Sequence, residues 1–230
     1  MFVCVDRFTL VHSFYSVSNI IRTIFFTGEI ASKVKNACIP SDTFIIVSVC
    51  CGIPITEIES QCLCLCLDRD KKALSTGVIV KKNSPKKSRT ILAEYNYQEG
   101  MKNLMQSISD STGKQIKILF QHPSPSADGV DDLRRACTDI MECIATGTVS
   151  TICFVYDSAP GKTCWEKDGL LALCKQETYL DQSSFYVSDE KLISKKGDTN
   201  VIHPLFGLTS RFGWARMKNS DEFTFSISRL

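Results

Sequence analysis

The residues whose types and spacing could do chemistry lie around two apolar segments in the first third of the chain. The first segment, at about 43–51, runs into a tight turn that contains Gly52, and the second, at about 62–67, is followed by Asp68. Unbroken apolar runs are typical of parallel strands buried on both faces, and ligands bind at the carboxyl ends of such strands. An acid about 20 residues after a glycine turn can accept hydrogen bonds from a ribose. Asp68 follows Gly52 at a slightly shorter separation, which predicts a site for a nucleoside-bearing cofactor.

The elements that would position this site alternate along the chain. Apolar runs predict strands at about 43–51, 62–67, 89–97, 116–120 and 149–156, and an alternating pattern predicts a last strand around 223–227. Helical stripes lie before the first strand and between the later ones, with stops predicted at Gly28, Gly113 and Gly147. The order predicts an α/β, doubly wound, mostly parallel sheet with an antiparallel ending. We expect residues 1–40 to form a helical extension and residues 41–230 to form the main domain, with a turn at 219–221 joining the last strand to the region of Trp214.

From about Asp42 onward the sequence resembles the class I, Rossmann-like S-adenosylmethionine-dependent methyltransferases. The matching segments are Val-Cys-Cys-Gly-Ile-Pro at 49–54 for the glycine-rich first motif, Leu-Asp-Arg-Asp-Lys-Lys-Ala-Leu at 67–74 for the ribose-binding acid, and Phe-Gln-His-Pro-Ser-Pro at 120–125 for the catalytic loop. The resemblance implies a seven-stranded sheet whose last strand runs antiparallel inside a closing hairpin. It also implies S-adenosylmethionine as methyl donor and S-adenosylhomocysteine as product.

The same resemblance implies roles for individual residues at the carboxyl ends of the strands. Cofactor-binding roles fall on Ser48, Cys50, Gly52, Asp68, Glu94 and Asn96, and catalytic roles fall on His122, Pro123, Ser124 and Pro125. Two prolines would rigidify the catalytic loop, and His122 could alternatively act as a general base. Plainer alternatives stay open: a helix-capping acid for Asp68, a solvated strand end for Glu94 and Asn96, and an ordinary turn for the loop.

The first motif departs from the family pattern. The family has an acid where Ser48 stands and glycines where Cys50 and Pro54 stand, so that Gly52 is the glycine that matches. Those glycines let the backbone approach the donor closely, and side chains there would crowd it. A second hypothesis is therefore a catalytically inactive relative that serves as a binding or assembly module. A nicotinamide-dependent oxidoreductase is disfavoured because no Gly-x-Gly-x-x-Gly follows the first strand.

Charge and hydropathy bear on the partners of the protein. A formal net charge of +2 does not by itself indicate a nucleic-acid-binding protein. The basic segment Lys81–Arg89 and the His122 loop nevertheless favour a nucleic acid as methyl acceptor, RNA above all, with a solvated basic loop as the alternative. The chain shows neither a secretory signal nor an apolar run long enough to span a bilayer, so we expect a soluble, cytoplasmic protein without membrane contact. The oligomeric state is left open.

The twelve cysteines do not predict a metal site. Cys62, Cys64 and Cys66 alternate with leucines and so share one face of a strand, whereas a zinc site usually needs two cysteines separated by two residues at a turn. Disulfide frameworks belong to small secreted chains. We therefore expect reduced thiols in the core and no bound metal.

Overall fold

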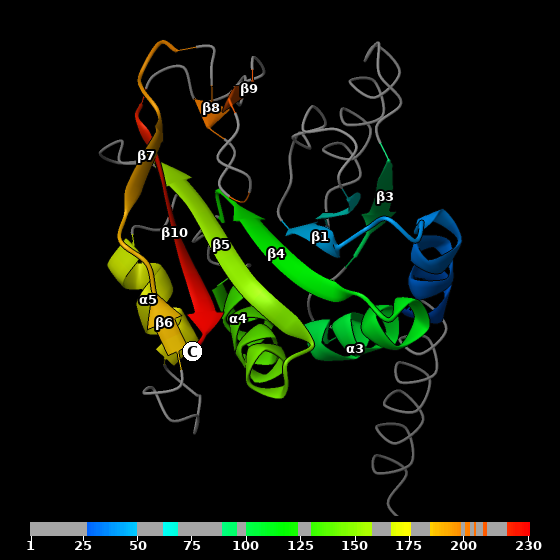
Figure 1. Ribbon diagram of the computed structural model, residues 1–230. Helices are drawn as coiled ribbons and strands as arrows, with labels where there is room; N and C mark the ends of the chain where they lie inside the picture. Colours follow the sequence, from blue (N-terminus) through cyan, green and yellow to red (C-terminus); the bar gives the residue numbers. More distant parts are fainter. Residues whose placement is uncertain are drawn as a thin grey trace, which may run out of the picture.

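The computed structural model describes residues 27–49, 62–68, 89–95, 100–123, 130–157, 167–175, 185–198, 201–202, 205, 209–210 and 220–230 (Figure 1). Within these residues the chain forms one large sheet, with helices packed along it, and a separate pair of short strands, β8 (Val201–Ile202) and β9 (Thr209–Ser210).

The large sheet follows the doubly wound order predicted from the sequence. Its strands are β1 (Phe44–Val49), β2 (Leu63–Asp68), β3 (Thr90–Glu94), β4 (Gln115–Gln121), β5 (Val149–Asp157), β6 (Phe185–Val187), β7 (Lys191–Ser194) and β10 (Glu222–Arg229). They lie in the order β3-β2-β1-β4-β5-β10-β6, with β7 also paired to β10. The chain runs outward from β1 through β2 to β3 and then returns to the other side of β1 for β4 and β5. All pairs from β3 to β5 are parallel.

The carboxyl-terminal strand confirms the predicted antiparallel ending. β10 lies between β5 and β6 and runs antiparallel to both, and it pairs in the same sense with the short strand β7. The predicted seven strands thus account for the main path of the sheet, and β7 makes an eighth. The described antiparallel partners of β10 are β5, β6 and β7, while the region of Trp214 lies outside the described residues.

Four helical segments pack against the sheet in the described part of the chain: residues 27–37, α3 (Met101–Thr112), α4 (Val130–Thr146) and α5 (Lys167–Lys175). Gly113 ends α3 as predicted, with a left-handed φ of 65° and its amide bonded to Ser109. Gly28, where the sequence predicts a stop or break, is itself helical within residues 27–37, and the helix predicted before it lies outside the described residues. The helix at 27–37 is held by its apolar face, where Ile30 and Val34 are buried. No described helix is long and apolar enough to cross a membrane.

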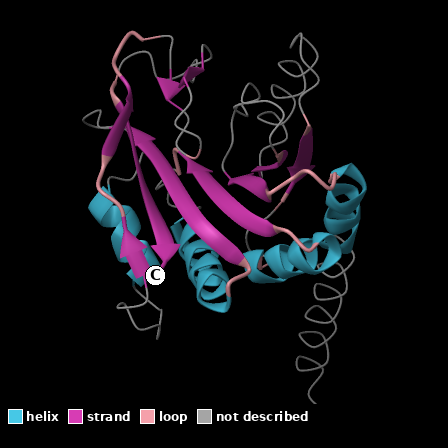
Figure 2. Cartoon of the chain, in the orientation of Figure 1, coloured by secondary structure: helices cyan, strands magenta, loops and turns pink. Residues whose placement is uncertain are grey.

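The two faces of the sheet differ in what they bury. One face and the described helices share a large core that includes Val34, Met105 and Ile140 from the helices, as Figure 2 shows by the helices lying along one side of the sheet. At its centre Phe154 stacks on Phe120 and on Phe225, each at 5.1 Å between ring centroids. The opposite face carries a smaller apolar cluster. Most of its residues come from the strands, while Cys62 precedes β2 and Leu205 lies between β8 and β9. The strand residues are Phe44, Ile46, Cys64, Leu119, Cys153, Val155 and Ile193.

Candidate functional site

Polar side chains gather at one edge of the sheet, where the parallel strands end. β2 ends at Asp68, β3 at Glu94, β4 at Gln121 and β5 at Asp157. Because β10 is antiparallel, its first residue, Glu222, meets this same edge, directly opposite Asp157. Ligands of open α/β sheets bind at the carboxyl ends of the strands, where the strand order reverses. The edge therefore divides into a half over β1, β2 and β3 and a half over β4, β5 and β10.

The first half contains two of the predicted cofactor residues side by side. Asp68 and Glu94 are directly paired in the parallel register of β2 and β3, so their side chains leave the same face of the sheet. Asp68 is 9% exposed and Glu94 is exposed. The backbone of Asp68 is fixed by Tyr95, whose amide donates to the Asp68 carbonyl at 3.0 Å and whose hydroxyl donates to Gly100 O at 2.8 Å. Two acids at adjacent strand ends can accept hydrogen bonds from the hydroxyl groups of a ribose.

Ser48 lies at the junction between the two halves, and its hydroxyl is hydrogen-bonded to a neighbouring strand, a contact that no local sequence pattern predicts. The side-chain amide of Gln121 donates a short hydrogen bond to the Ser48 hydroxyl, and both residues are buried. The other amide atom of Gln121, Oε1, is buried and makes no hydrogen bond within the described part of the chain. The sequence predicts Gln121 in the catalytic loop, but the structure has it as the last residue of β4. A buried acceptor of this kind is available to a ligand that donates an N–H or O–H group.

His122 begins the predicted catalytic loop with an unusual backbone. Its φ is 47°, the one positive φ among described non-glycine residues, and its amide donates to Val155 O at 2.8 Å. The next residue, Pro123, is buried. His122 Nε2 lies 3.3 Å from Oε1 of Glu222, and the two side chains are 12% and 2% exposed. The sequence pattern predicts no role for Glu222 or Asp157; its one signal is an acid that precedes the pattern of the last strand and an acid that follows the apolar run of β5.

The remaining predicted residues of the site lie outside the described residues. These are Cys50, Gly52, Asn96, Ser124 and Pro125. Of the predicted set, the structure therefore places Ser48, Asp68, Glu94, His122 and Pro123 along one edge of the sheet.

Comparisons with known proteins give structural likeness without a sequence relative. A scan against protein-family models finds no match, and a search of curated proteins finds none either. Among solved structures, a Clostridium thermocellum protein assigned as an rRNA methylase has 14% identity and a TM-score of 0.46 over 89% of this chain and 97% of that one. A Methanosarcina mazei S-adenosylmethionine-dependent methyltransferase has 10% identity and a TM-score of 0.46 over 83% and 93%. The glycopeptide N-methyltransferase MtfA, solved with S-adenosylmethionine, has 9% identity and a TM-score of 0.45 over 87% and 86%.

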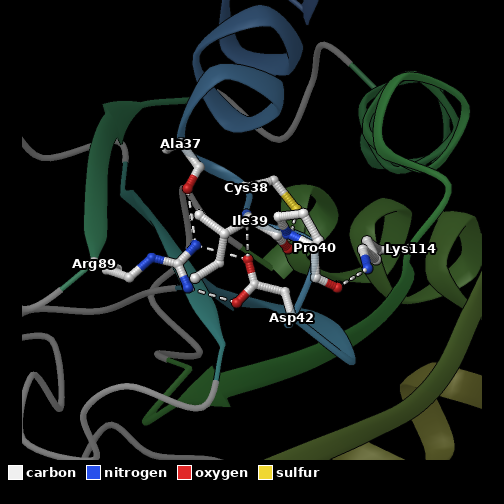
Figure 3. Close-up of polar contacts among 7 residues, drawn as sticks. All are labelled: Ala37, Cys38, Ile39, Pro40, Asp42, Arg89 and Lys114. Atoms are coloured by element: carbon white, nitrogen blue, oxygen red, sulfur yellow. Dashed lines mark hydrogen bonds and ion pairs between the residues drawn. The ribbon is translucent and has the colours of Figure 1, made fainter.

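The strongest charged network of the described residues lies at the opposite, amino edge of the sheet (Figure 3). Arg89, just before β3, donates to both carboxylate oxygens of Asp42 at 2.5 and 2.6 Å and to Ala37 O at 2.8 Å. Asp42 also accepts the Ile39 amide at 2.9 Å, and Lys114 donates to Pro40 O at 3.1 Å. Because parallel strands begin at this edge, the network fixes the entry of the chain into β1 and takes no part in the candidate site.

The network also affects the predicted basic surface at Lys81–Arg89. The Arg89 charge is already paired with Asp42, which is 1% exposed at its side chain. Residues 81–88 lie outside the described residues. A contact with nucleic acid at this segment therefore depends on its lysines.

The described cysteines form no disulfide with one another, and most of them are buried. Cys38 and Cys64 are half-buried, and the buried ones are Cys62, Cys66, Cys137, Cys143, Cys153 and Cys174. Burial raises the pKa of Cys62, Cys143 and Cys153 to about 12, so these thiols are protonated at neutral pH. Within the described residues, no group of three or more His, Cys, Asp or Glu side chains is arranged to hold a metal ion.

Proposed function

We propose that the protein is an S-adenosylmethionine-dependent methyltransferase whose acceptor is a nucleic acid, with RNA favoured. The observation that carries the proposal is the carboxyl edge of the sheet, where Asp68 and Glu94 end neighbouring parallel strands in direct register. The strand order supports it, because β10 runs antiparallel between β5 and β6, as the resemblance to class I methyltransferases implies.

The residues present suit a nucleoside-bearing methyl donor. Asp68 is mostly buried and is fixed through its backbone, so that its carboxylate can be held in place to accept ribose hydroxyl groups. S-adenosylmethionine, when bound, supplies an electrophilic methyl group. Such a transfer requires the acceptor atom in line with that methyl group, so holding the two molecules in position does most of the catalytic work.

The half of the edge over β4, β5 and β10 would hold the acceptor. Gln121 offers a buried carbonyl oxygen, and His122 and Pro123 lead into the loop at 124–125. The direct support for RNA is the proline-containing loop together with the lysines at 81–88, and both are features of the sequence. Contacts between these lysines and phosphates would make binding to RNA weaken as the salt concentration rises.

A second function, a catalytically inactive binding or assembly module, has one specific observation in its favour. Ser48, which stands where the methyltransferase family has an acid, is buried and hydrogen-bonded to Gln121. A side chain engaged in this way holds β1 to β4 and contributes less to a bound donor. Under this alternative the carboxyl edge would bind no methyl donor.

Calorimetric titration with S-adenosylmethionine and S-adenosylhomocysteine separates the two functions. We expect a dissociation constant on the order of tens of micromolar or poorer, because side chains at Cys50 and Pro54, where the family has glycines, would crowd the donor. Asp68→Ala should weaken it by about ten- to a hundredfold, since a charge-assisted hydrogen bond contributes roughly 1.5–3 kcal/mol. Asp110→Ala removes the same charge from an exposed position on α3 and serves as the control.

No binding at millimolar donor would support the inactive module, and unchanged binding in Asp68→Ala would remove Asp68 from the site.

The acceptor is tested by incubating the protein with total RNA and a methyl-labelled donor, followed by nucleoside analysis. His122→Ala should abolish methyl transfer and leave donor binding intact, because His122 lies in the acceptor half of the edge. Label in added protein fractions and none in RNA would contradict the RNA acceptor.

A further inference from the structure

The carboxylate of Glu222 is buried at the acceptor half of the edge without the hydrogen bonds such a group normally has. Glu222 is 2% exposed, and within the described part of the chain neither of its carboxylate oxygens makes a hydrogen bond. The imidazole of His122 lies beside it, with Nε2 3.3 Å from Glu222 Oε1. That separation is within ion-pair range, but the two groups are not aligned for a hydrogen bond. Catalytic hydrogen bonds are often long in the free enzyme and shorten when substrate binds.

Two other polar residues lie opposite Glu222 in the sheet. In the antiparallel register, Glu222 faces Asp157 of β5, which is also 2% exposed, and Ser194 of β7. Two carboxylates on facing positions repel each other when both are charged, and burial makes each charge costly. An N–H group on Nε2 of His122 is the donor placed beside Glu222, and it can supply the hydrogen bond that this carboxylate lacks in the described part of the chain.

The backbone conformation of His122 also indicates that its surroundings hold this residue in place. A φ of 47° is uncommon for a residue with a side chain, and such conformations persist where the surroundings impose them. The Val155 carbonyl holds the His122 amide and buried Pro123 follows, so three strands, β4, β5 and β10, converge on this residue.

We propose that Glu222 is the positioning residue of the acceptor loop, holding the His122 imidazole with its proton on Nε2. In this arrangement Glu222 contacts neither donor nor acceptor and acts through His122. The inference rests on the proposed methyltransferase function only for its effect on turnover, because the state of the imidazole can be observed without any reaction.

Nitrogen NMR of the imidazole rings tests the pairing directly. The chain has three histidines, and the His122 signals are assigned by their loss in His122→Asn. In mildly alkaline buffer, where an ordinary histidine is neutral, we expect wild-type His122 to show the tautomer with the proton on Nε2. Glu222→Gln keeps a carbonyl acceptor and should preserve this signature, whereas Glu222→Ala should give a mixture of tautomers. A wild-type signature in Glu222→Ala overturns the proposal.

Methyl transfer to RNA gives the second measurement. Glu222→Ala should lower kcat by about 10- to 100-fold, as with carboxylates that orient metal-bound histidines, with donor affinity unchanged and much of the rate restored in Glu222→Gln. Thr224→Val is the matched control, because Thr224 lies on the same face of β10, is buried, and donates its hydroxyl to Phe154 O at 2.8 Å. It should lower stability and leave the His122 signature and kcat in place.

His122→Gly separates the side chain from the backbone. Glycine adopts a positive φ without strain, so this variant keeps the shape of the loop and loses the imidazole. Wild-type turnover in His122→Gly would overturn the proposal, since the pairing would then have no consequence. If the wild type bound no methyl donor, the proposed function would fail while the tautomer measurement would still decide the pairing.

Discussion

Asp42→Asn is the substitution whose effect on stability can be worked most directly from the structure. The Asp42 side chain is 1% exposed and receives both terminal nitrogens of Arg89 and the Ile39 amide. Asparagine keeps the shape of the side chain but removes the charge, which leaves the Arg89 guanidinium without its partner. Removing one member of a buried ion pair costs about 3–5 kcal/mol. Because Arg89 is 23% exposed and can turn to water, we expect the lower end, about 3 kcal/mol.

Urea denaturation at neutral pH measures this loss. The control is Glu29→Gln, which breaks the ion pair of Glu29 with Lys33 at 2.6 Å, where the two side chains are 60% and 59% exposed. An exposed pair of this spacing contributes about 0.5 kcal/mol or less despite its short distance. Combining Asp42→Asn with Arg89→Met should give a coupling of more than about 1 kcal/mol. A loss below that value in Asp42→Asn alone would refute the idea that the network holds the amino edge.

The pH dependence gives an independent check. Burial alone would raise the pKa of Asp42, but the hydrogen bonds from Arg89 and the Ile39 amide outweigh it and hold the pKa below its usual range. The stabilisation is therefore complete above the unfolded pKa of about 4 and is lost as the pH falls through the lowered folded value. The difference in stability between wild type and Asp42→Asn should shrink in acid and stay constant from pH 5 to pH 8, where this carboxyl does not titrate.

Two further predictions concern the core. Because burial raises the pKa of Cys62, Cys143 and Cys153 to about 12, these thiols should react with iodoacetamide only after unfolding. Mass spectrometry of native protein should find no disulfide, and chelators should leave Tm unchanged; stoichiometric zinc would contradict this. Phe154→Ala should cost about 3–5 kcal/mol in urea denaturation, since Phe154 is fully buried between two stacked rings. Tyr186→Ala, at a side chain 54% exposed on the edge strand β6, should stay within about 0.5 kcal/mol.

The strands and their order could be predicted because their signals are local. The apolar run of β1 indicates a strand buried on both faces, and the alternation in β10 indicates a strand buried on one face. Both strands begin and end within a few residues of the predicted bounds. The same patterns predicted where two of the strands end, and Asp68 and Glu94 are the last residues of β2 and β3. The cofactor roles of these two acids stay predictions.

The contacts that join distant segments could not be predicted from local patterns. Asp42 and Arg89 lie on different loops, and in sequence Arg89 looks like the last charge of a basic run. Glu222 meets His122 only because β10 inserts beside β5 in antiparallel register, which brings the start of one strand to the end of others. The pleat of a strand gives the face of a side chain, but the identity of its neighbour depends on which strands pair.

The two edges of the sheet bear on the choice between an enzyme and an inactive module. At the amino edge every charge of the Arg89 and Asp42 network is satisfied, as expected for a structural role. At the carboxyl edge Gln121 Oε1 and both Glu222 oxygens are buried without hydrogen bonds in the described part of the chain. Leaving such groups unsatisfied costs about 1–3 kcal/mol each, and a scaffold gains nothing from that cost. Proteins accept local violations of this kind at functional sites, so Gln121 Oε1 is available to a ligand and the Glu222 carboxylate is available to the His122 imidazole.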